Sequence, residues 1–183
     1  MVQTYGAIFG LGMIMFGLYL VKDGAAGFAA MDEASELVQA IKGFYALSFL
    51  VGLVFTLIVQ SNIAIILITI AMASAGLFGP EEAAMAMFGA QAGTGILTYI
   101  FSFHSRGSAR QVVISQISFD VIATLFFVAL FYLEQIFGLP LLMALAGAVS
   151  ESVSGQAITI ALVFQFGGAA LLVVLREPVF SYI

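Results

Sequence analysis

The chain has 183 residues, of which 63% are hydrophobic and 8% are charged. Soluble domains are about 45–50% apolar and about 25% charged, so this composition predicts an integral membrane protein with a single transmembrane domain over residues 1–183. The net charge is −5 and the sequence has no basic patch, which argues against nucleic acid as a partner. The chain has no cysteine, which excludes disulfides and thiolate metal sites.

The first apolar segment covers residues 5–21 and predicts a membrane-spanning helix that ends at Lys22-Asp23-Gly24. Four glycines between residues 6 and 17 offer it small-residue faces for packing on a neighbouring helix. Residues 25–42 mix acids with apolar side chains and predict an amphipathic helix at the membrane interface. The apolar segments of the chain are continuous instead of alternating, which indicates helices and argues against a membrane β-barrel.

Residues 43–80 contain no Asp, Glu, Lys, Arg or His. One helix crosses a membrane with about 20 residues, so this longer run has to break, tilt or double back. The polar triplet Gln60-Ser61-Asn62 lies near its centre, where amides and a hydroxyl are costly unless they line a cavity or meet protein partners. The triplet is therefore a candidate binding site. Gly79-Pro80-Glu81-Glu82 closes the run and is typical of a helix start.

Residues 83–103 are apolar but hold a second polar stretch at their centre, Gly89-Ala-Gln91-Ala-Gly93-Thr94-Gly95. Each glycine in a helix interior costs about 1 kcal/mol relative to alanine. Three glycines together with a carboxamide and a hydroxyl predict a transmembrane helix that unwinds at this stretch.

A further span is predicted over residues 111–131, and Asp120 is the one acid that lies inside a predicted span. Gln116 lies one turn before it on the same helix face. A carboxylate in this position could take up a proton, bind a cation, or pair with Arg110 or a water-filled vestibule. The sequence leaves these alternatives open.

Residues 132–153 predict a looser connection, and a last span is expected over residues 158–175, interrupted by Gln165 and Gly167-Gly168. We interpret Gln165 as a polar residue at a helix contact. His104 lies in a polar turn with no second His or Cys nearby, so a solvated loop histidine is expected there and not a metal site.

The two polar stretches resemble motifs of the type II sodium/phosphate cotransporter family. Gln60-Ser61-Asn62-Ile63-Ala64 is similar to the family's Gln-Ser-Ser-Ser-Ala motif in a re-entrant hairpin, and residues 89–95 are similar to its Gly-Ala-Asn-Ile-Gly-Thr-Thr stretch. Residues 109–120 and 161–165 resemble its two His-x-x-Phe-Asn segments. Here both histidines are absent, and Asp120 and Gln165 stand at the asparagine positions.

This resemblance implies an all-α membrane protein: a helical bundle with a re-entrant hairpin and an unwound transmembrane helix, forming one unit of an inverted-repeat transporter. Family members carry two copies of the hairpin motif, whereas this chain carries one, so it resembles half a transporter, namely the C-terminal half. The implied substrate is inorganic phosphate or a related small anion, moved with Na⁺ by alternating access. No organic cofactor is expected.

The resemblance also implies a site at the membrane midplane. The expected substrate and ion ligands are Gln60, Ser61, Asn62, Gln91 and Thr94, with Asp120 and Gln116 as secondary candidates and Na⁺ at Ser61, Asn62 and Thr94. Broken helices suit this chemistry because their N-termini present N–H groups to an anion, while freed carbonyls and side-chain oxygens coordinate a cation.

Half a transporter needs a partner, so a homodimer or a complementary transporter half is expected. The chain is expected to cross the lipid bilayer of the cell (inner) membrane several times. The alternative is a non-transporting scaffold or accessory subunit whose polar residues only join helices. An enzyme is the least favoured class, because the spans carry no Ser/His/Asp, Cys/His or His-x-x-x-His arrangement.

Overall fold

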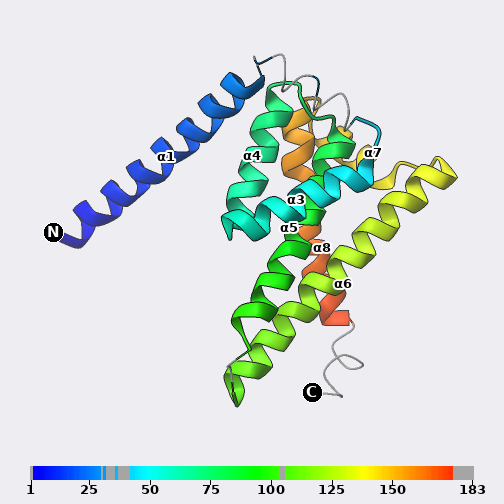
Figure 1. Ribbon diagram of the computed structural model, residues 1–183. Helices are drawn as coiled ribbons and strands as arrows, with labels where there is room; N and C mark the ends of the chain where they lie inside the picture. The colour runs from blue at the N-terminus through cyan, green and yellow to red at the C-terminus, as the bar shows by residue number, and fades with distance from the viewer. Residues whose placement is uncertain (1, 30, 32–35, 37–41, 104–105, 175–183) are drawn as a thin grey trace.

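A computed structural model describes residues 2–29, 31, 36, 42–103 and 106–174, and within these residues the chain is helical with no strand (Figure 1). The helices are α1 (Val2–Ala29), α3 (Tyr45–Val59), α4 (Asn62–Ser74), α5 (Pro80–Phe101), α6 (Ser108–Phe137), α7 (Leu141–Val149) and α8 (Val153–Val174). The prediction of an all-α protein is thereby confirmed.

Three of the described helices are long and apolar enough to cross a membrane: Pro80–Phe101, Arg110–Phe137 and Val153–Val174. The apolar stretch Tyr5–Val21 of α1 and the helices α3 and α4 are shorter. The chain is thus a membrane protein in which spanning helices are combined with shorter apolar ones.

Helix α5 forms the centre of the bundle, with α3, α4, α6 and α8 packed around it. Its residues 82–91 are all buried. Half of them are alanine or glycine, and such small side chains let neighbouring helix backbones come close in a membrane protein. The helix begins at Pro80 with Glu81 and Glu82 in its first turn, which confirms the predicted start.

The predicted unwinding of residues 89–95 is wrong, because α5 is a continuous helix from Pro80 to Phe101. Its glycines serve close packing instead. A Cβ added at Gly89 would collide with the carbonyl oxygen of Phe49 on α3, and one added at Gly52 of α3 would collide with the carbonyl oxygen of Ala86. Packing of the two backbones against each other compensates for the low helix propensity of glycine.

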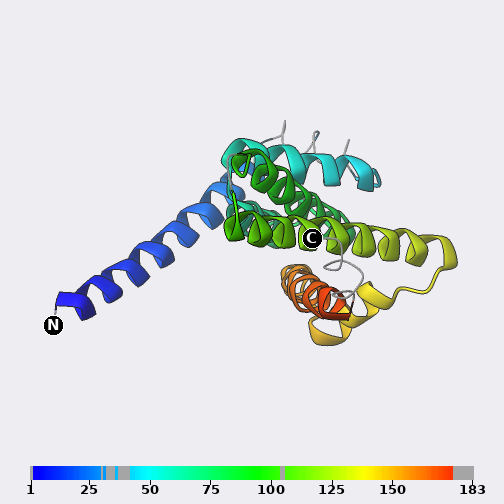
Figure 2. The ribbon, with the colours of Figure 1, turned by 90° about the horizontal axis from the view of Figure 1, so that it is seen from below.

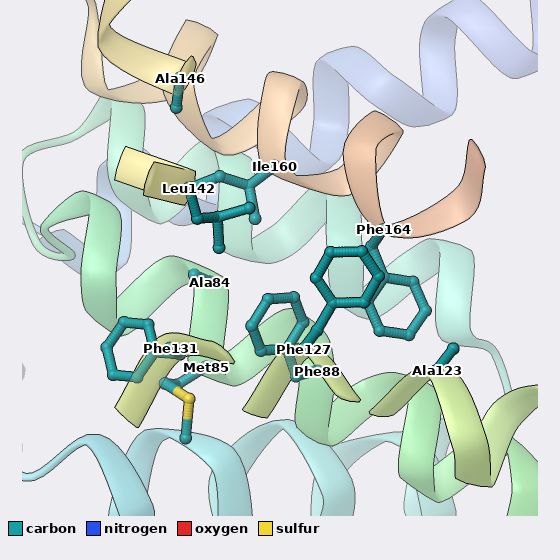
Figure 3. Packing of buried hydrophobic residues seen from close by; sticks show 10 residues of the cluster. All are labelled: Ala84, Met85, Phe88, Ala123, Phe127, Phe131, Leu142, Ala146, Ile160 and Phe164. Carbon is teal, nitrogen blue, oxygen red and sulfur yellow. The ribbon is translucent and has the colours of Figure 1, made fainter. Parts of the chain in front are cut away.

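An aromatic cluster holds α5, α6 and α8 together (Figure 3). The rings of Phe88, Phe127 and Phe164 pack with centroids 5.0–5.9 Å apart. The buried residues of this cluster are Ala84, Met85, Phe88, Ala123, Phe127, Phe131, Leu142, Ala146, Ile160 and Phe164. These side chains fix the three spanning helices relative to one another, which positions the polar residues at their midpoints.

Helix α1 projects away from the other helices and meets α4 near its own C-terminal end (Figures 1 and 2). It continues past Lys22-Asp23-Gly24 to Ala29, so the predicted end of this helix is wrong. A Cβ added at any of its glycines would have no atom within 4 Å, and the expected packing on a neighbour is not seen within the described chain. Most of the predicted interfacial helix, residues 25–42, lies outside the described residues.

The expectation of a loose segment over residues 132–153 is also wrong. Helix α6 continues to Phe137, Gly138 ends it in the left-handed conformation, and α7 follows. Buried Glu134 accepts a hydrogen bond from the N–H of Leu142 at the start of α7. A carboxylate at a helix N-terminus stabilises that helix, so α6 and α7 meet at a defined corner.

Helix α8 runs without interruption through Gln165 and Gly167-Gly168, contrary to the prediction. The two glycines again permit close packing. A Cβ on Gly167 would lie 2.9 Å from the ring of Phe127, and one on Gly168 would lie 3.0 Å from the Cβ of Ala123. The glycines therefore seat α6 against α8 and leave the helix intact.

Candidate functional site at the helix midpoints

Gln60 and Ser61 form the two-residue turn between α3 and α4. Gln60 adopts φ 57° and ψ 27°, and among the described residues it is the one non-glycine with a positive φ. Its backbone N–H donates to the carbonyl of Thr56 at 2.8 Å. Ser61 is extended and caps α4, because its Oγ accepts a hydrogen bond from the N–H of Ala64 at 3.3 Å. The polar triplet thus marks a sharp change of direction.

The first turn of α4 carries partial positive charge. The first N–H groups of a helix lack partners within the helix, and the helix dipole places partial positive charge at that end. Ser61 occupies one of these donors, that of Ala64. The remaining N–H groups in the first turn of α4 come immediately after Gln60 and Ser61 in the chain, so they lie beside the polar triplet.

Three amide side chains from three helices form a connected network at this turn. The Nδ2 group of Asn62, the first residue of α4, donates to the Oε1 atom of Gln91 on α5. The Nε2 group of Gln91 donates to the Oε1 atom of Gln165 on α8 at 3.1 Å. The structure therefore brings together Asn62 and Gln91, as predicted.

The network lies at the middle of the spanning helices. Gln91 is at the centre of Pro80–Phe101, and Gln165 is close to the centre of Val153–Val174. Gln91 is only 4% exposed, whereas Gln165 is exposed on the bundle surface. Polar groups at mid-span are costly in a membrane and usually serve function.

The other predicted ligands are placed differently. Thr94 is half-buried, and its Oγ1 donates to the carbonyl of Ala90 in its own helix at 3.1 Å. The side chain of Gln60 is exposed. Neither side chain hydrogen-bonds to the amide network within the described residues, so their part in the site stays a prediction.

Asp120 is buried at the middle of α6, only 1% exposed, opposite Gly95 of α5. A Cβ added at Gly95 would lie 3.1 Å from the Cβ of Asp120, so glycine makes room for the acid. The Nε2 group of Gln116 donates to Asp120 Oδ1 at 3.2 Å, while Oδ2 has no partner. Arg110 is exposed and forms no bond with Asp120, so their pairing is not seen in this part of the chain.

Two parts of the site were missed at the sequence level. Gln165 is at a helix contact as expected, but its partner is the candidate ligand Gln91, and no local pattern joins residues so far apart. Thr124 is 6% exposed with an unpartnered Oγ1 atom. Its position one turn after Asp120 was the available signal, since such residues share a helix face.

Clusters of three or more His, Cys, Asp or Glu residues do not occur in the described part of the chain. His104 lies outside the described residues. Any metal ion held by the described helices would therefore need hydroxyl, amide or carbonyl oxygens besides at most two acidic or histidine side chains, and such oxygen ligands suit hard cations.

Comparison with known proteins identifies the family. The model of the Na⁺/Pi-cotransporter family matches residues 13–144, well over half of the chain. The chain belongs to this family. The family is one of transporters, and the resemblance to sodium/phosphate cotransporters expected from the sequence is thereby confirmed.

The chain is also similar to bacterial proteins named "Putative inorganic phosphate export protein YjbB". It is 26% identical to the protein of Salmonella typhimurium and 25% identical to that of Escherichia coli, over 116 residues in each case. These matches cover 63% of this chain and 21% of each relative, so the chain spans about a fifth of the curated relatives' length. No solved structure matches the chain.

Proposed function

We propose that the chain is a half-unit of a sodium-coupled secondary transporter for phosphate or a related anion. It lies in the inner membrane with several crossings, binds ion and solute at the membrane midplane around the α3–α4 turn, and works by alternating access. Membership of the Na⁺/Pi-cotransporter family and the names of the phosphate export relatives support the substrate class.

The amide network Asn62–Gln91–Gln165 is the observation that carries the proposal. It connects the α3–α4 turn with the midpoints of two spanning helices. Amide N–H groups donate to an anion, amide oxygens accept from it or bind a cation, and neither bears a net charge. Dipoles of this kind replace a hydration shell without holding the solute too tightly to release it.

Helix lengths support a re-entrant hairpin. Helix α3 has 15 residues and α4 has 13. At a rise of 1.5 Å per residue they are about 22 Å and about 20 Å long, whereas the hydrocarbon core is about 30 Å thick. Two such helices joined by Gln60-Ser61 enter from one side and return to it, which leaves the turn inside the membrane.

Ser61, Asn62 and Thr94 supply the oxygens proposed for Na⁺. The Oδ1 atom of Asn62 is buried and has no hydrogen-bond partner, so it is available to a cation. The hydroxyl oxygens of Ser61 and Thr94 take part in one hydrogen bond each and keep lone pairs. The N–H groups at the start of α4 face the anion.

A second transporter half is proposed to complete the site, in the economical case a second, inverted copy of this chain. Inverted repeats place the binding site at the interface between the two halves, so the site in this chain is incomplete until it pairs.

Phosphate flux into or out of proteoliposomes tests the function. Wild-type chain is expected to move radiolabelled phosphate in Na⁺ and much less in choline. Gln60→Ala and Ser61→Ala are expected to lower the flux with unchanged protein abundance, whereas Ser150→Ala, at the distant α7–α8 junction, leaves it unchanged. Wild-type vesicles that carry no phosphate under either condition contradict the proposal.

A scaffold subunit is the second candidate, and one observation favours it. Gln91 uses both its Oε1 and its Nε2 on protein partners, as expected of a residue that only joins helices. Under this alternative Gln60→Ala and Ser61→Ala reduce folding or abundance, and flux falls only in proportion to the amount of folded protein.

A further inference from the structure

The basic residues of the chain are few: Lys22, Lys42, Arg106, Arg110 and Arg176. Lys and Arg close to membrane-spanning segments set the orientation in which a chain inserts, because the face that carries more of them stays in the cytoplasm, whereas Asp and Glu contribute little. The orientation of this chain therefore depends on how its basic residues divide between the two ends of the helical bundle.

The hairpin of α3 and α4 starts and finishes at the end of the bundle where α5 begins, here called the α5-start end. The N–H group of Gly43, just before α3, donates to Glu82 Oε1 in the first turn of α5 at 3.3 Å. Leu77, just after α4, packs in a buried cluster with Ala83 of α5. Lys42, next to Gly43 in the chain, therefore lies at the α5-start end.

Lys22 is at the same end of the bundle as Lys42. It follows directly on the apolar stretch Tyr5–Val21 of α1, towards the end of α1 that meets α4 (Figures 1 and 2). Arg106 and Arg110 lie at the opposite end, where α5 turns into α6, and both are exposed (Figure 1). The basic residues of the described chain thus divide two against two between the α5-start end and this α5–α6 end.

Arg176 lies outside the described residues, two positions after the end of α8 at Val174. Helix α8 runs in the same direction as α5 (Figure 1), so it finishes at the α5–α6 end. Counting Arg176 with that end by its place in the chain makes the division two against three. An excess of one basic residue is a weak bias on orientation.

We propose that this balance of basic residues lets copies of the chain insert in both orientations, and that the charges at the two ends of the bundle set the share of each orientation. The proposal rests on the proposed function in one respect, since an inverted copy is the partner that an inverted repeat requires. A hairpin that instead crossed the membrane once would bring all the basic residues to one face, and copies would then take a single orientation.

Single cysteines report the orientation, because the chain has no cysteine of its own. Ser74→Cys at the exposed end of α4 and Ser102→Cys at the end of α5 place a thiol at each end of the bundle. A membrane-impermeant maleimide is added to spheroplasts before and after lysis. We expect each cysteine to be labelled from outside in about a tenth or more of the molecules, with the two fractions adding up to the whole.

Neutralising the α5-start end is expected to fix the orientation. Lys22→Gln with Lys42→Gln leaves basic residues only at the α5–α6 end, which then stays in the cytoplasm. Labelling of Ser102→Cys from outside is expected to fall by about tenfold or more, while labelling of Ser74→Cys becomes nearly complete. Lys22→Arg with Lys42→Arg keeps both charges and is the matched control, expected to label like the wild type.

Neutralising the α5–α6 end with Arg106→Gln, Arg110→Gln and Arg176→Gln is expected to give the opposite orientation. A wild type labelled from outside at one of the two cysteines only overturns the proposal, and so does an orientation that stays the same when either end is neutralised. If a neutralised variant does not fold, unchanged labelling in Lys42→Gln alone overturns it.

Phosphate flux separates this proposal from the proposed function. The two neutralised variants are each expected to carry little Na⁺-dependent flux alone and to recover it when they are co-expressed, because each then supplies the inverted partner of the other. Labelling that follows the charges, with no flux in any combination, overturns the proposed function and leaves the control of orientation standing. Na⁺-dependent flux in a wild type of single orientation overturns only the control of orientation.

Discussion

The side chain of Gln91 makes a hydrogen bond to each of two other helices, and these bonds stabilise the bundle to a limited extent. Hydrogen bonds between membrane helices contribute about 0.6 kcal/mol on average. The unfolded chain in the membrane also finds partners for its polar groups, which keeps the net value low. Hydrogen bonding alone therefore gives a weak reason for an amide at the centre of α5.

A double-mutant cycle on Asn62→Leu and Gln91→Leu measures this bond. We expect a coupling of about 0.6 kcal/mol in the free energy of unfolding from micelles, because each single change already removes the hydrogen bond between Asn62 and Gln91. Asn62→Leu with Gln116→Leu is the control pair and is expected to be additive, since Gln116 bonds Asp120 instead. Additivity of Asn62→Leu and Gln91→Leu contradicts the network.

At the scale of the helices, α3 and α5 are held together by backbone contact through Gly52 and Gly89. Gly89→Ala is expected to destabilise the fold by about 1–3 kcal/mol, as overpacking does, because the new methyl group meets the carbonyl of Phe49. The free energy of unfolding is the measurement.

The same substitution in open space is the control for Gly89→Ala. Gly12→Ala on α1 meets no atom within 4 Å and is expected to stabilise its helix by up to about 1 kcal/mol, from propensity alone. Equal effects of Gly89→Ala and Gly12→Ala would show that close packing does not explain the glycines of α5.

The helices were predictable from sequence to different degrees. Long uncharged segments indicated the spans, and Pro80 with two acids marked the start of α5, because hydropathy and capping are local properties. The unwinding of residues 89–95 was mispredicted because the cost of glycine is local, whereas the contact of Gly89 with Phe49 is tertiary. For the same reason α8 was expected to break at Gly167-Gly168, which pack on α6.

The candidate site was predictable in part. The polar triplet and Gln91 were recognisable as unusual in membrane sequence, and Asn62 does bond Gln91. The third amide, Gln165, is joined through a contact between distant segments, and Thr124 stands out only once its hydroxyl is known to be buried without a partner. The sequence therefore shows which positions are polar, but only the folded structure shows which of these side chains contact one another.

At the scale of the whole molecule, α1 and the outer faces of the bundle leave many apolar side chains exposed in the described chain. Lipid covers such surfaces in a membrane protein, and so does a second transporter half. The proposed inverted dimer requires that copies of the chain insert in both orientations.

Tags at the two termini of the full chain, probed for accessibility from each side of the membrane, test the dimer. We expect each tag to be reached from both sides, because two oppositely oriented copies complete an inverted repeat. A single orientation with no partner chain in the membrane contradicts the inverted dimer.

Phosphate flux per folded molecule in Gln91→Leu tests whether the amide network serves transport and not only packing. Leucine keeps the volume of the side chain, and losing its hydrogen bonds costs little stability. With Gln111→Leu, at an exposed position of α6, as the matched control, we predict at least a tenfold loss of Na⁺-dependent flux in Gln91→Leu alone. Wild-type flux in Gln91→Leu would contradict a role of the amide network in transport.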